Sequence, residues 1–228
     1  MEPEQLPLTI PGGGSPRRLP SRISPMQPVA VDEPFDDAGY LFEPWWPGIR
    51  AIVFAEHGRL RMQVSGLADA LAAFPELAAI TAELREDGVV LDGWLVVLDA
   101  SGRPDPELLR ARLSGARRGG APAYVASDLL WSAGRSWTRR SFAARRRELG
   151  EVLPGAGRAI VGRGYPGEGH LVADALAALG IDGLSARRLD ARYRAGEAGE
   201  SWLRAPITPR VRERPALALI LRLPLHPE

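Results

Sequence analysis

Arginine is the residue type that dominates the reactive chemistry available to this chain. All 29 basic residues are arginines, and the sequence contains neither lysine nor cysteine. The chain therefore has no lysine amine to act as a nucleophile, form a Schiff base or hold a phosphate, and no disulfide, cysteine nucleophile or thiolate metal site. A GC-rich codon preference would also favour arginine, so its abundance alone does not indicate a function. The three histidines, His57, His170 and His226, are far apart in sequence, which argues against a histidine metal cluster.

The densest group of arginines lies within nine residues near the middle of the chain. Its members are Arg139, Arg140, Arg145, Arg146 and Arg147. Guanidinium groups at this spacing suit a nucleic-acid phosphate backbone, whereas a solvated helix face is the alternative. Charge is also uneven, since residues 1–110 hold 9 arginines and 17 acidic residues and residues 111–228 hold 20 and 11. A basic second half suits nucleic acid or a surface that complements the acidic first half, and the sequence leaves both open.

The pattern of apolar residues predicts more strands than helices. We expect strands at 49–54, 59–64, 89–99, 124–130, 183–188, 202–204 and 216–223. We expect helices at 67–84, with a second segment opening at Pro75, and at 106–113, 141–152 and 170–179. A hairpin turn at 56–58 and irregularly spaced helices predict an α+β fold with mostly antiparallel sheets.

The two ends of the chain differ in composition from the middle. Residues 1–22 are rich in proline, glycine and serine and are expected to form a disordered leader. An ordered domain is expected at 23–206, followed by a tail at 207–228 with one possible strand. No apolar run approaches the ~20 residues that cross a bilayer, and the N-terminus lacks the pattern of a secretory signal. We therefore expect a cytoplasmic protein without a membrane partner.

Several segments in register resemble the adenylation domain of ATP-dependent DNA ligases of the bacterial end-joining type. Residues 42–50, F-E-P-W-W-P-G-I-R, resemble the motif E-P-K-W-D-G-x-R. Residues 124–130, Y-V-A-S-D-L-L, resemble Y-V-x-F-D-L-L, and residues 181–188, I-D-G-L-S-A-R-R, resemble L-E-G-V-V-A-K-R. Residues 193–196 and 201–204 resemble Y-R-P-G and the start of W-L-K-V-K. The resemblance covers 23–206 and implies an ATP-grasp-like nucleotidyltransferase domain of antiparallel sheets with packed helices. Because 22 residues follow Pro206, we expect no OB-fold.

The family chemistry begins with a lysine amine that attacks the α-phosphate of ATP. This attack forms a phosphoramide-linked AMP and releases pyrophosphate. Magnesium and cationic side chains neutralise the phosphates, and an aromatic ring stacks on the adenine. By resemblance alone, the implied cofactors are ATP and magnesium and the implied partner is DNA.

This sequence departs from the family pattern at most of those positions. Trp45 occupies the position of the nucleophilic lysine, and an indole has no basic amine. The other replacements are Pro47 for aspartate, Trp94 for the strand glutamate, Ser127 for the adenine-stacking phenylalanine, Asp182 for glutamate, and Arg187, Arg204 and Pro206 for lysines. The arginine of the family's S-R-N-G turn is also missing, since residues 64–67 read V-S-G-L. The retained residues are Glu43, Gly48 and Arg50.

These replacements give two interpretations of each candidate site residue. Trp45 and Trp94 either fill the former nucleotide pocket as core or stack on a base. The candidates for a residual anion or cofactor site are Glu43, Arg50, Arg187 and Arg204. The alternative is that these arginines pair with Asp182, Glu43 or Asp92. Asp182 is the candidate metal ligand, although magnesium needs several oxygen ligands.

We interpret the sequence as a degenerate ligase-like adenylation domain. It is predicted to be unable to form lysyl-AMP, to need no cofactor, and to bind or regulate DNA or a DNA-repair protein. One alternative is a functional ATP-dependent DNA ligase of DNA repair and recombination, as the resemblance implies. The other is a non-catalytic nucleic-acid-binding protein that uses the arginine cluster.

Overall fold

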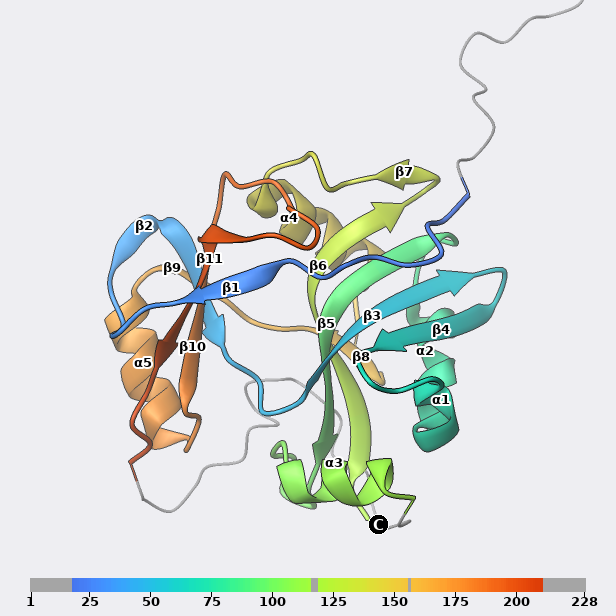
Figure 1. The fold of residues 1–228 in the computed structure, drawn as a ribbon, viewed down its shortest axis with the longest axis horizontal. Coiled ribbons are helices and arrows are strands. Elements are labelled where there is room, and N and C mark those ends of the chain that lie inside the picture. Colours follow the sequence, from blue (N-terminus) through green and yellow to red (C-terminus); the bar gives the residue numbers. More distant parts are fainter. Residues whose placement is uncertain (1–17, 116–118, 156, 211–228) are drawn as a thin grey trace, which may run out of the picture.

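The computed structural model describes residues 18–115, 119–155 and 157–210, where two β-sheets stand side by side (Figure 1). The first sheet has the order β1 (Gln27–Ala30), β11 (Ala198–Pro206), β10 (Gly183–Arg188), β2 (Asp37–Pro44) and β9 (Tyr165–Gly167). The second has the order β4 (Arg59–Val64), β3 (Ile49–Glu56), β5 (Val89–Leu98), β6 (Ala121–Ser132) and β7 (Arg135–Ser136), with β8 (Ala159–Val161) paired to β6. The pairs β1–β11 and β6–β8 are parallel and the other pairs are antiparallel. The expected α+β fold with mainly antiparallel sheets is confirmed.

Short helices cover the sheets, and three of those in the described residues begin at side chains that cap them. The helices are α1 (Ala70–Ala73), a 3₁₀ helix (Pro75–Ala79), α2 (Ile80–Glu83), α3 (Pro106–Leu113), α4 (Phe142–Val152) and α5 (Gly169–Ala178). Asp105 accepts hydrogen bonds from the backbone N–H groups of Glu107 and Leu108, and the following proline occupies the first helical position. Ser141 caps α4 in the same way. Helix α5 packs on β10 and β2, and α4 packs on β6.

The second sheet is buried on both faces, which explains the apolar composition of β5. One face of β5 presents Trp94 and Val96 to a core that lies between the sheets and extends to α5. The other face presents Leu95 and Val97 to a second core under α1, α2, α3 and α4. Asp92 lies two residues before Trp94 and is fully buried. Strand alternation thus turns selected residues of β5 toward the first sheet.

Some expected elements differ from the structure in extent. The helix expected at 67–84 is divided into three short pieces, and the break falls at Phe74, because Pro75 begins a new segment. The strand expected at 124–130 extends to 121–132, and the one at 202–204 extends to 198–206. Most of the leader, residues 1–17, and the strand expected at 216–223 lie outside the described residues. In the part that is described, no helix is long and apolar enough to span a membrane.

Candidate functional site

The candidate site residues from the sequence converge in the space between the two sheets. Strand β3 carries Arg50, β5 carries Asp92 and Trp94, β10 carries Arg187, and Trp45 follows β2 directly. The register of β10 with β2 and of β3 with β5 fixes the positions of these residues along the two sheets. Residues as far apart in sequence as Arg50 and Arg187 therefore share one polar interior.

The best-defined group in this interior is a buried carboxylate held by Arg50. Nε of Arg50 donates to Oδ1 of Asp92 at 2.7 Å, and its Nη2 pairs with Oδ2 of the same carboxylate. The hydroxyl of Tyr193 donates to Oδ2 at 2.7 Å and receives the backbone N–H of Met26 at 3.0 Å. Burial opposes ionisation of Asp92, but the charge and hydrogen bonds of Arg50, with smaller contributions from Arg187 and Tyr193, lower its pKa. Burial, and next the Asp92 charge, raises the pKa of Tyr193, so its hydroxyl remains protonated.

A second buried carboxylate, Asp128 on β6, joins two arginines. Arg145 donates from Nε and Nη2 to its two oxygens at 2.7 and 2.9 Å. Arg187 donates from Nη1 at 3.2 Å, and its own Nε has no hydrogen-bond partner. Burial lowers the pKa of Arg187, while the charge of Asp128 opposes this effect. Because Arg187 is 3% exposed, its guanidinium group faces protein on all sides.

Glu43 is the least satisfied charged group of the interior. Its Oε1 lies 3.0 Å from Nη2 of Arg146, but the geometry is not that of a hydrogen bond. Arg146 instead donates to the backbone carbonyl oxygens of Gly162, Ala126 and Ser127. Burial raises the pKa of Glu43, and the charges of Arg146 and Arg187 oppose this only in part.

Three indole rings close the side of the interior next to this network. The ring of Trp45 meets that of Trp94 edge-on with centroids 4.7 Å apart and lies 5.8 Å from that of Trp202. Trp202 is 1% exposed and donates from Nε1 to the hydroxyl of Ser185 at 2.9 Å. The guanidinium groups of Arg50 and Arg187 lie 4.2 and 4.3 Å from the centroid of the Trp202 ring, within the range of cation–π attraction.

Known proteins are similar to this chain in sequence and in fold. No protein-family model matches the chain. The multifunctional non-homologous end joining protein LigD of Mycolicibacterium smegmatis is 33% identical over 168 residues, 74% of this chain and 21% of that protein. A probable DNA ligase of Streptomyces griseus is 33% identical over 196 residues, 80% of this chain and 36% of that protein. The structure of mycobacterial DNA ligase D complexed with ATP and MES matches with a TM-score of 0.71 and 31% identity, covering 81% of this chain and 60% of that chain.

This chain is homologous to the adenylation domain of ATP-dependent DNA ligases. The ATP-dependent DNA ligase of bacteriophage T7 shares the fold, with a TM-score of 0.50 and 17% identity over 82% of this chain and 69% of that chain. The chain spans about one fifth of the length of the LigD proteins that it matches.

The ligase resemblance gave two residues at the outer end of the site, Arg204 and Asp182. Arg204 is exposed and lies 4.5 Å from the Trp45 ring centroid. Asp182 is exposed as well, and both line a pocket of about 330 Å³ between the segment after β2 and helix α3. Within the described ranges no three His, Asp or Glu side chains gather as a metal site would require. Asp182 therefore belongs to no such group of three.

The arginine cluster divides into two groups in the structure. Arg145 is 2% exposed and bound to Asp128, and Arg146 is largely buried against backbone carbonyl groups. Arg139, Arg140 and Arg147 are exposed. Only these three side chains are available to an external phosphate backbone.

The sequence interpretation did not identify Asp128, Tyr193 and Trp202 as members of this site. Asp128 lies within an otherwise apolar strand, and a charged residue in such a run signals a buried partner. Tyr193 and Trp202 fall in segments that resemble ligase motifs, but their side-chain contacts join positions 101 and 17 residues apart in sequence. Such contacts require the tertiary arrangement of the sheets.

Proposed function

We propose that this chain is an adenylation domain that has lost the ability to form lysyl-AMP and that acts as a binding or regulatory domain in DNA repair. The observation that carries the proposal is Trp45. It stands at the position that matches the nucleophilic lysine, in a chain without any lysine. The nitrogen lone pair of an indole belongs to the aromatic system and does not attack phosphorus.

The surrounding residues also fit poorly with bound ATP and magnesium. Trp45 and Trp94 are in ring contact at positions where the ligase pattern has a lysine and a glutamate. Arg187, at a lysine position, is buried and paired with Asp128. Asp182 is an exposed carboxylate in this region, and it belongs to no group of three His, Asp or Glu side chains among the described residues. We therefore derive no nucleotidyl-transfer step for this chain.

Radiolabelled nucleotide tests the proposal directly. The purified chain, incubated with α-³²P-ATP and magnesium, should give no labelled polypeptide, while an active DNA ligase in a parallel reaction is labelled. The variant Trp45→Lys should also stay unlabelled, because Trp94 and Ser127 still replace the glutamate and the stacking ring of the pattern. Label on the wild-type chain would overturn the proposal. Label on the variant alone would show that the rest of the site still binds ATP and that only the nucleophile is lost.

A nucleic-acid-binding role is favoured by the three exposed arginines of the cluster. In the described part of the chain, the side chains of Arg139, Arg140 and Arg147 make no ion pair. Three phosphate contacts would give a slope of log K against log salt of about −2.7 on duplex DNA.

A gel-shift titration at several salt concentrations tests this second role. Replacing the three exposed arginines by glutamine should reduce the magnitude of the slope by about 2.7. A matched control replaces Arg85, Arg110 and Arg194, which are also exposed but already paired with glutamates. An equal loss of slope in both triple variants would indicate that binding depends on overall positive charge and not on these three side chains. Absence of a gel shift by the wild-type chain at low salt would exclude the nucleic-acid-binding role.

A further inference from the structure

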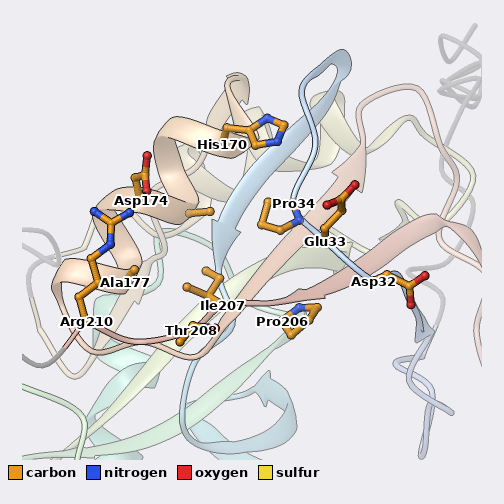
Figure 2. Close-up of a pocket in the computed structure, with 11 residues that line it drawn as sticks. Asp32, Glu33, Pro34, His170, Asp174, Ala177, Pro206, Ile207, Thr208 and Arg210 are labelled. Carbon is orange, nitrogen blue, oxygen red and sulfur yellow. Dashed lines mark hydrogen bonds and ion pairs between the residues drawn. The ribbon is translucent and has the colours of Figure 1, made fainter.

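A groove lies on the far side of the first sheet, away from the indole rings and the buried ion pairs. It measures about 570 Å³ and lies between helix α5, the end of β11 and the segment that follows β1 (Figure 2). Ala173, Ala177 and Ile207 line it with apolar surface, and Pro34 and Pro206 extend this surface. On α5, Leu171 follows the groove-lining His170 in sequence and is 64% exposed.

The rim of the groove is acidic. Asp32 and Glu33 stand on one side and Asp174 on the other (Figure 2). Asp32 and Glu33 are exposed, and neither forms an ion pair within the described residues. Two nitrogen-bearing side chains also lie at the rim: Nδ1 of His170 is 3.1 Å from Oδ2 of Asp36, and Arg210 pairs with Asp174. The two free carboxylates would attract a positively charged segment.

The chain itself leaves the described structure at this groove. The backbone N–H of Arg210 donates to the carbonyl oxygen of Ala177 at 2.9 Å, and its side chain is bound to Asp174. Residue 210 is thereby fixed at the rim, on helix α5. Whatever follows residue 210 begins beside the groove.

The sequence after residue 210 matches the groove in chemistry. Leucines recur at every second position from Leu217 to Leu223, so an extended segment presents them on one side. Between residues 212 and 223 there are three arginines and one glutamate. Five intervening residues, 211–215, span up to about 17 Å, which is ample for reaching a site that begins at residue 210.

We infer that the groove binds the chain's own C-terminal segment, Ala216–Leu223. The leucines cover the apolar floor and Leu171, while Arg212, Arg214 or Arg222 meet Asp32 and Glu33. Because residue 210 is anchored at the rim, binding is intramolecular and its effective concentration is high. The inference is independent of whether the domain forms lysyl-AMP.

A nitroxide placed beside the groove tests the inference in the intact chain. Since the sequence has no cysteine, Leu171→Cys gives one labelling site, on a side chain that is already exposed. In ¹⁵N spectra of the full chain, the amide signals of residues 216–223 should be lost when the label is paramagnetic and return when it is reduced. The control label is Ser65→Cys, an exposed position in the turn that follows β4, which should leave those signals intact.

Two further measurements decide between possible occupants. Chain without ¹⁵N that carries the nitroxide is mixed with ¹⁵N chain that carries no nitroxide, and this mixture should show no signal loss. A signal loss in the mixture would assign the groove to a second copy and overturn the inference. The variants Leu219→Ser with Leu221→Ser, and separately Asp32→Asn with Glu33→Gln, should restore the signals. Unchanged signals with the label at residue 171, or equal loss from both label positions, would also overturn it.

Discussion

Replacing Arg145 by methionine tests whether the space between the sheets is held by a buried ion-pair network. Arg145 is 2% exposed and directs its guanidinium group at Asp128 through two hydrogen bonds. Its Nη1 also donates to the carbonyl oxygens of Arg140 at 2.6 Å and Ala191 at 3.0 Å. Methionine keeps an unbranched apolar stem of similar reach and removes these four donated bonds.

The expected loss follows from what remains around Asp128. Its carboxylate keeps one ion pair, to Arg187 at 3.2 Å, and one backbone hydrogen bond, from Leu129. Removing one partner of a buried pair costs about 3–5 kcal/mol. The carbonyl of Arg140 belongs to an exposed residue, so water can replace its donor and little is added. We therefore expect the free energy of unfolding to fall by about 3–5 kcal/mol, and the Tm to fall by roughly 6–20 °C for a chain of this length.

Urea unfolding followed by tryptophan fluorescence measures this change, because buried indoles such as Trp94 and Trp202 report the loss of the core. Arg147→Met is the matched control: it lies on the same helix, its side chain is exposed, and its replacement should change the free energy of unfolding by less than about 0.5 kcal/mol. If both variants lose less than about 1 kcal/mol, the network contributes no more than surface pairs do, and the reasoning is refuted.

Three other substitutions probe the same interior. Burial raises the pKa of Glu43, so the folded state binds the proton of this carboxyl group more tightly than the unfolded state does. The stability that the protonated group contributes is complete below about pH 4.3 and is lost as pH rises through the raised pKa. Glu43→Gln should remove this part of the pH dependence, seen as flatter urea midpoints from pH 4 to 8 (about the range of shifted carboxyls), and an unchanged profile would contradict it. Trp94→Ala should cost about 3–5 kcal/mol, because the ring is 7% exposed and packs on Trp45; Tyr165→Ala, 42% exposed, is its control in the same unfolding assay. Gly93→Ala should cost at least about 1–3 kcal/mol, because its Cβ would lie 2.2 Å from the Val125 carbonyl oxygen, while Gly199→Ala, with open space around it, should be near neutral in thermal melts.

Features with local causes were predictable from the sequence. The β-rich composition of residues 89–99 predicted a strand, and β5 forms there and is buried at every residue. Asp105 followed by Pro106 indicated the start of a helix, and α3 begins there. The helix expected at 170–179 is α5, and Gly180 follows it with a φ of 76°, the left-handed conformation that favours glycine.

Features that depend on distant contacts were not predictable. The strands β8 and β9 have three residues each, and β9 contains Pro166, so neither has a local strand pattern. They exist because β6 and β2 pair with them. The arginine cluster is intermediate between these cases: Phe142, Arg145, Leu149 and Val152 follow one helical stripe, so Arg145 is marked as inward-facing by its spacing. Its partner Asp128 is 17 residues away on another element, and only the fold shows that pair.

The physical costs of substitution explain why some ligase-pattern residues are present here and others are replaced. Arg50 and Asp92 are buried partners, so replacing either alone leaves a charge without its counterpart at a cost of about 3–5 kcal/mol. Trp45, by contrast, is only half-buried and lies beside exposed Arg204, where an indole adds apolar contacts with Trp94 and Trp202. An indole at that position leaves no buried charge unpaired, whereas replacing Arg50 or Asp92 alone would do so. Trp45 is thus a replacement at a half-buried position, whereas Trp94, Ser127 and Arg187 replace ligase-pattern residues at buried positions, where the neighbouring side chains must accommodate them.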